Sequence, residues 1–200
     1  MKLRVSVKQM LVDLLSIQPQ VMKLYRDNEK YQTLIQFLCA KDYYNDEDLL
    51  YPTLKEVEVG TGIASHKVRK QIKEIYNSFF DFETEYSFDF SSIEVWFNAE
   101  YYKRYASFKC LNLNYIPRVG ENIDLPFLRA KVGTNYFYVK EIRHFFENNI
   151  QRVEIYLKPG SYNSYWQYRL DKALELKEIG YGEIYSLYEY QIKERLGLRN

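Results

Sequence analysis

The spacing of apolar residues in this 200-residue chain changes near Phe80. Before that point apolar residues recur every three or four positions, as in Val7, Leu11 and Leu14, which is typical of amphipathic helices. From Phe80 to Phe90 aromatic residues alternate with mostly acidic ones, which is the two-residue period of a β-strand. Helices followed by strands predict an α+β fold, and the length allows two domains.

Residues 1–80 are expected to form the helical domain. Apolar stripes predict one helix that begins near residue 7 and stops before Pro19, and a second over roughly 29–43. A short helix is expected to open at Pro52 and to close near Gly60 or Gly62, because helix ends adopt a left-handed backbone that favours glycine. The segment GIASHKVRKQIKEIY, residues 62–76, then predicts a longer amphipathic helix.

Residues 54–76 resemble the helix-turn-helix of the winged-helix DNA-binding regulators of the gluconate-repressor family. The residues that carry the resemblance are Leu54, Val57, Gly62, Ile63, Val68, Arg69 and Ile72. In such a motif Gly62 lets the chain reverse, while Ile63 and Val68 hold the second helix against the first. Glu58 departs from the pattern, which usually has a small residue there.

The resemblance implies that the second helix presents its outer face to duplex DNA. Outward side chains of such a helix lie at the major groove or at its phosphates. The expected DNA-binding residues are Ser65, His66, Lys67, Arg69, Lys70 and Lys73.

Charge is unevenly distributed although the net charge is only +1. Residues 77–100 contain six acidic residues and no basic one, whereas residues 1–76 contain 12 basic and 10 acidic residues. We expect residues 81–100 to be a strand with one solvated face or a linker, since metal sites usually need ligands from several elements. One hypothesis is that Asp81, Glu83, Glu85 and Asp89 occupy the basic helix when DNA is absent.

Residues 101–200 are expected to form a second domain. Strand-like segments are expected at 93–97, 101–113, 117–127, 135–146 and 151–159, and an Asn-rich turn lies between the last two. Five short strands with tight turns predict a small antiparallel barrel, closed or nearly closed, of SH3-like or OB-like type. Two C-terminal helices would close it. One covers roughly 162–178, and the other begins at a capping box of Ser186 and Glu189 and ends at Gly197.

Two aromatic groups in this half also carry cations, a composition that suits single-stranded nucleic acid. One is residues 101–109 and the other residues 162–169. The alternative is ordinary packing. Helical spacing of Trp166, Leu170, Ala173 and Leu174 favours packing for the second group.

The sequence contains no motif typical of catalysis or of a metal site. His66 and His144 are the only histidines, and His144 is expected to be a packed or surface residue rather than a base. Cys39 and Cys110 are too few for a disulfide framework or a thiolate metal site. We therefore expect a non-enzyme without a cofactor. The absence of a signal-peptide core and of an 18-residue apolar run predicts a cytoplasmic protein without a membrane partner.

Two functions from different classes remain open. The first is a DNA-binding protein, similar to a transcriptional regulator, whose C-terminal domain binds a protein partner or mediates self-association. The second is a structural or assembly protein with no role on nucleic acid. Exposure of the basic helix would favour the first.

Overall fold

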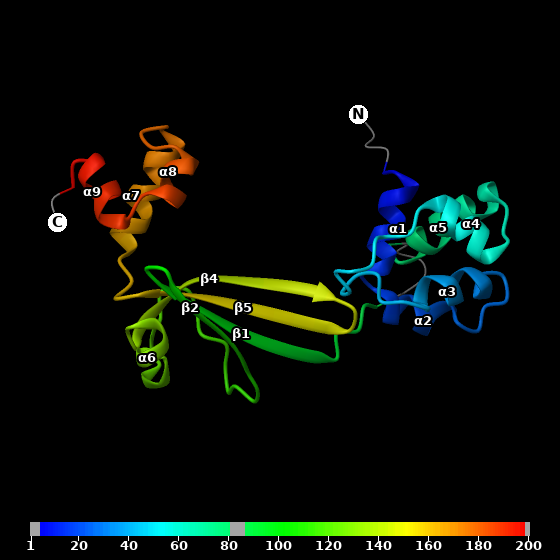
Figure 1. Ribbon diagram of the computed structural model, residues 1–200, viewed down its shortest axis with the longest axis horizontal. Coiled ribbons are helices and arrows are strands. Elements are labelled where there is room, and N and C mark those ends of the chain that lie inside the picture. The colour runs from blue at the N-terminus through cyan, green and yellow to red at the C-terminus, as the bar shows by residue number, and fades with distance from the viewer. Residues whose placement is uncertain (1–4, 81–86, 199–200) are drawn as a thin grey trace. The chain divides into compact units, whose positions relative to one another are not determined.

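Helices precede strands along the chain, as the change of apolar period predicts (Figure 1). The computed structural model describes residues 5–80 and 87–198. The N-terminal helices are α1 (Val7–Leu15), α2 (Gln18–Tyr25), α3 (Gln32–Cys39), α4 (Leu54–Thr61) and α5 (Ser65–Ser78). The strands follow, and the C-terminal helices come last, so the α+β class is confirmed.

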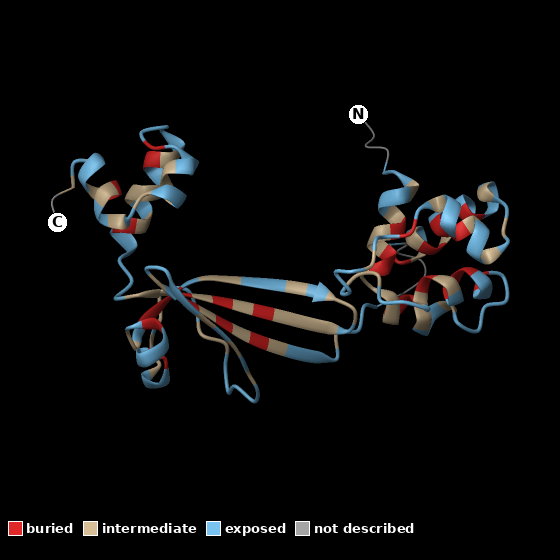
Figure 2. Cartoon of the chain, viewed as in Figure 1, coloured by how far each residue is buried: buried red, intermediate tan, exposed pale blue. Residues whose placement is uncertain are grey.

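The N-terminal helices enclose one apolar core (Figure 2). Leu11, Leu14 and Leu15 of α1 are fully buried or nearly so, as are the inner residues of α5. Full burial of one such side chain contributes about 1.5–3 kcal/mol, so this core is the main stabilising feature of the helical region.

Pro19 lies at the start of a helix, α2, that the sequence analysis did not predict. The helix α1 ends at Leu15, and Pro19 occupies the first turn of α2. A proline is tolerated there because its missing N–H would have no partner within the helix in any case. The expected helix over 29–43 is present in shorter form as α3.

The C-terminal helices are α7 (Ser164–Glu175), α8 (Tyr181–Ser186) and α9 (Glu189–Arg195). They have a small core of their own, formed by Trp166, Ala173, Ile179 and Ile192. The expected capping box of Ser186 and Glu189 is wrong. The N–H of Tyr188 instead donates to Gln191 Oε1 at 2.9 Å, and α8 occupies the preceding residues.

The strands form one five-stranded sheet in the order β2-β1-β5-β4-β3. Their bounds are β1 (Ser92–Tyr101), β2 (Arg104–Cys110), β3 (Asn122–Asp124), β4 (Tyr136–Glu147) and β5 (Ile150–Pro159). The N–H of Ser92 donates to the carbonyl of Asn149 at 3.5 Å, so β1 and β5 start at the same end of the sheet. The sheet is therefore mixed, since β3 runs antiparallel to β4 with Ile123 opposite Phe137.

The sheet is not closed into a barrel, so a closed antiparallel barrel was a wrong expectation, and the SH3-like or OB-like arrangement stays a prediction. Closure requires the two outer strands to pair with each other, and here the outer strands are β2 and β3. The strand β3 has three residues and β2 has seven, so β3 is too short to complete a wall. The Asn-rich hairpin between β4 and β5 is confirmed, and Asn148 adopts the left-handed conformation at φ 54°.

The alternating segment after Phe80 falls partly outside the described residues, which exclude 81–86. Residues 87–91 are described and belong to no strand. Phe88 and Phe90 stack at a centroid distance of 6.2 Å, and Phe90 contacts Phe146 at 5.1 Å. The aromatic residues in this part therefore pack within an irregular segment and do not form the face of a strand.

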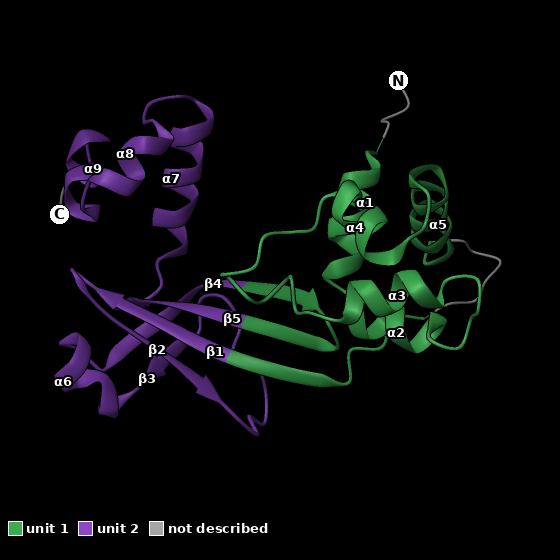
Figure 3. Cartoon of the chain, turned by 45° about the vertical axis from the view of Figure 1, so that its right-hand side comes forward, with its two compact units in different colours: residues 1–95, 143–153 green, residues 96–142, 154–200 purple. Residues whose placement is uncertain are grey.

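The chain divides into two compact units (Figure 3). Unit 1 comprises residues 1–95 and 143–153, and unit 2 comprises residues 96–142 and 154–200. The strands β1, β4 and β5 contribute residues to both units. In unit 2, a short 3-10 turn (Pro126–Leu128) and α6 (Arg129–Val132) follow β3, and α6 packs on β2. The expected domain boundaries at 80 and 100 stay a prediction.

Candidate nucleic-acid interface

The turn between α4 and α5 is defined by hydrogen bonds at both ends of α4. Thr53 and Glu56 form a capping box, in which Thr53 Oγ1 accepts from the N–H of Glu56 at 3.2 Å and Thr53 N–H donates to Glu56 Oε2 at 2.7 Å. The hydrogen bond that the backbone N–H of Thr53 donates to the carboxylate lowers the pKa of Glu56. At the other end Gly62 adopts a left-handed φ of 68°, and its N–H donates to the carbonyl of Glu58 at 2.9 Å. The reversal expected at Gly62 is therefore present.

The helix α4 also packs closely on α3. A methyl group at Gly60 would overlap the ring of Phe37, so glycine permits the close approach of the two helices. Glu58, which departs from the expected pattern, is half-buried.

The helix α5 has a buried face and a basic face. Val68, Ile72 and Ile75 have no exposed surface and pack with α1 and α4. Opposite them His66, Arg69, Lys70 and Lys73 recur at i, i+3, i+4 and i+7, which places them on one helix face.

The structure places the six expected DNA-binding residues as follows. His66, Lys67, Arg69, Lys70 and Lys73 are all exposed. Ser65 is half-buried at the start of the helix, on the side nearer Ile72. Four of these residues share one face of α5 and Lys67 lies beside it, and we call the five exposed residues together the basic face below.

Most of the positive charge of the basic face has no acidic neighbour that neutralises it. Lys70 Nζ lies 4.0 Å from Glu74 Oε1, but Glu74 is bound more closely by Lys30, at 2.9 Å. The hydrogen bond from Lys30 lowers the pKa of Glu74. Within the described ranges 5–80 and 87–198, no acidic group lies within ion-pair distance of Lys67, Arg69 or Lys73.

The N-terminus of α5 is open as well. Ala64 precedes the helix, and no side chain caps its first turn. The first N–H groups of a helix carry partial positive charge and bind phosphate readily. The open N-terminus lies next to His66 and Lys67 in sequence, so backbone and side-chain charge reinforce each other there.

Of the acidic residues proposed to occupy the basic helix, only Asp89 lies within the described residues. Its carboxylate is 3.0 Å from Lys23 Nζ of α2, and its carbonyl accepts from Gln20 Nε2 at 2.6 Å. Asp89 is therefore engaged with α2. Asp81, Glu83 and Glu85 fall outside the described residues.

The structure describes the surroundings of His144 and of Cys39. His144 is exposed, and its Nδ1 lies 3.0 Å from Gln151 Nε2. No cluster of three or more His, Cys, Asp or Glu suited to a metal occurs among the described residues. Burial raises the pKa of Cys39 to about 11, which disfavours a reactive thiolate. None of the described helices is long and apolar enough to cross a bilayer.

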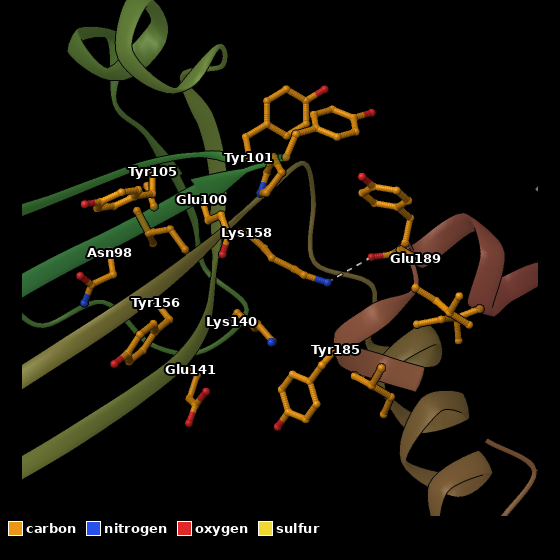
Figure 4. Close-up of a pocket in the computed structure, with 18 of the residues that line it drawn as sticks. Asn98, Glu100, Tyr101, Tyr105, Lys140, Glu141, Tyr156, Lys158, Tyr185 and Glu189 are labelled. Atoms are coloured by element: carbon orange, nitrogen blue, oxygen red, sulfur yellow. Dashed lines mark hydrogen bonds and ion pairs between the residues drawn. The ribbon is translucent and has the colours of Figure 1, made fainter. Parts of the chain in front are cut away.

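The aromatic groups of the C-terminal half have different roles. Trp166, Leu170, Ala173 and Leu174 pack in the core of the C-terminal helices, so the packing alternative is confirmed for them. Tyr101, Tyr102 and Tyr105 line a cleft of about 930 Å³ in unit 2, to which Trp166 and Leu170 also contribute (Figure 4). The other walls of the cleft come from β4, β5, α7 and residues 184–192, and sequence reasoning missed the cleft because no local pattern links these segments.

Comparison with protein-family models, with curated proteins and with solved structures gave no match for this chain.

Proposed function

We propose that this protein binds duplex DNA through α4 and α5, as a non-enzymatic protein similar to a transcriptional regulator. The observation that carries the proposal is the exposed basic face of α5, which follows a left-handed glycine turn and lies opposite the buried Val68, Ile72 and Ile75. A helix held in this way can enter the major groove without disturbing the core of its own unit.

Electrostatics support the same conclusion. Three cations of the basic face have no acidic partner among the described residues, and the helix N-terminus adds partial positive charge. The net charge of the whole chain is only +1, so attraction to phosphate depends on this local arrangement. Binding should therefore be concentrated at α5.

The test is the salt dependence of binding to a mixed-sequence DNA duplex. About four phosphate contacts, from Lys67, Arg69, Lys70 and Lys73, predict a slope near −4 when the logarithm of the association constant is plotted against that of salt concentration. The variant R69A/K70A should reduce the slope to about −2 and weaken binding. Its melting temperature should hardly change, because substitutions at exposed positions usually change stability by less than about 0.5 kcal/mol.

The matched control is K131A/K172A, which removes the same charge from exposed positions of unit 2. It should leave the slope unaltered. No binding at low salt, or equal slopes for the two double variants, would remove DNA binding from this face of the protein.

The alternative is an assembly role, and one observation favours it. The exposed fraction of Leu50 is 90% and that of Val59 is 75%, and both line a groove of about 650 Å³ beside α4. Exposed apolar residues beside a groove are typical of protein contacts. If DNA binding fails the test above, L50S/V59S should then change the oligomeric state measured by sedimentation, and an unchanged state would argue against assembly through this groove.

A further inference from the structure

The cleft of unit 2 is lined by seven tyrosines and Trp166 but by no phenylalanine, although the chain contains 12 phenylalanines. Tyr101, Tyr102, Tyr188 and Tyr190 form a continuous run in which neighbouring ring centroids lie 4.5, 6.1 and 6.0 Å apart. Each tyrosine provides a flat apolar surface together with a hydroxyl group. The cleft is therefore suited to a ligand with apolar rings and hydrogen-bond acceptors.

The charges of the cleft oppose a polyanionic ligand. Three lysines and three glutamates line it, so the formal charge of the lining is zero. Glu189 lies 3.5 Å from Lys158 and 2.7 Å from Lys193 (Figure 4 shows the first pair). The carboxylate of Glu100 is exposed at the same surface and would repel phosphate. Single-stranded nucleic acid usually binds in a groove of net positive charge, which this cleft lacks.

Tyr102 is held in a backbone conformation that tyrosine rarely adopts. It occupies the two-residue turn between β1 and β2 with φ 53°, where asparagine or glycine is usual. Its ring is 65% exposed and contacts both Tyr101 and Tyr188. Unfavourable backbone conformations of this kind are concentrated at binding sites. Here the turn positions an exposed ring between the sheet and α9.

We propose that this tyrosine cleft binds a proline-rich segment of a partner protein in the polyproline II conformation. The pyrrolidine rings of such a segment pack on exposed aromatic rings, as in other aromatic-lined grooves. A polyproline II helix has no internal hydrogen bonds, so its carbonyl groups accept from hydroxyls exposed in the cleft, such as that of Tyr185. It carries no charge, in agreement with a neutral lining. All the residues involved belong to unit 2, so the inference is independent of DNA binding by α5.

The test is fluorescence anisotropy of a labelled ten-residue polyproline peptide, titrated with the full chain. We expect saturable binding that Y188A weakens by about tenfold or more, since a central aromatic residue of an interface contributes more than about 1.4 kcal/mol. Y188F should weaken binding less than Y188A, because it keeps the ring. Y165A is the matched control, since Tyr165 on α7 is 64% exposed but does not line the cleft.

A second variant separates binding from folding. Y102G removes the ring and relieves the left-handed conformation, so binding should fall about tenfold while the melting temperature stays equal or rises. No saturable binding of polyproline would overturn the proposal, as would an equal loss in Y165A and Y188A. If oligothymidylate binds more tightly than polyproline, and Y188A weakens that binding too, the cleft is instead a site for single-stranded nucleic acid.

Discussion

Two glycines of α4, two residues apart, have different structural roles. Gly62 ends the helix with a left-handed backbone, whereas Gly60 lies inside the helix and gives room to Phe37 of α3. Both glycines looked like helix ends in the sequence. The close approach at Gly60 depends on a ring 23 positions earlier in the chain, so no local pattern predicts it.

The substitution G60A tests this contact, because two effects oppose each other. Alanine in place of glycine favours a helix by up to about 1 kcal/mol, but overlap with a packed ring costs about 1–3 kcal/mol. We expect a net loss of about 1 kcal/mol in the free energy of unfolding, measured with urea. In an F37A background the overlap disappears, so the same G60A change should become stabilising. Destabilisation of equal size in both backgrounds would show that Phe37 is not the cause.

At the scale of elements, the sequence predicts what depends on local spacing. The helix α5, the left-handed end of α4 at Gly62 and the Asn-rich hairpin were predicted because the residues that determine them are all local. Strand pairing was not found. The parallel neighbours β1 and β5 join segments more than 50 residues apart, and the same strand-like segments are compatible with a closed barrel or an open sheet. Five of the six residues predicted for α5 are exposed and Ser65 is half-buried, whereas the cleft is lined by segments that only the sheet and the C-terminal helices bring together.

Because α5 buries one face and exposes the other, substitutions at two neighbouring positions should have opposite outcomes. V68D places a charge where no surface is exposed, which costs several kcal/mol and approaches the whole stability of a small domain. Circular dichroism should show loss of helix. K67D introduces the same acid at an exposed position in the first helical turn, where negative charge is favourable, so its melting temperature should stay close to that of the parent. Full helix content in V68D would mean that α5 is turned the other way.

At the scale of the whole chain, unit 1 depends on residues that are distant in sequence. The tip of the β4–β5 hairpin belongs to unit 1, and the N–H of Asn148 donates to the carbonyl of Ser16 at 2.8 Å. Gln20, which is 1% exposed, donates through Nε2 to the carbonyls of Asp89, at 2.6 Å, and Asn148, at 3.3 Å. Gln20 Oε1 accepts from the N–H of Asp89 at 3.3 Å. One buried amide thus connects α2 to two other segments of the same unit.

This connection predicts that the substitution Q20L costs more in the full chain than in a fragment. In the full chain it removes the hydrogen bonds that the buried amide of Gln20 makes with Asp89 and Asn148, each of which contributes about 0.5–1.5 kcal/mol. A fragment of residues 1–95 lacks Asn148, so there the loss should be about half as large, and the fragment itself should be less stable. Hydrogen exchange of the α5 amides measures unfolding of unit 1 in both chains. The control Q36L, at an exposed position of α3, should cost less than about 0.5 kcal/mol in either chain. If Q20L costs the same in fragment and full chain, the bond to the hairpin contributes nothing to unit 1, and the helices fold independently of residues 143–153.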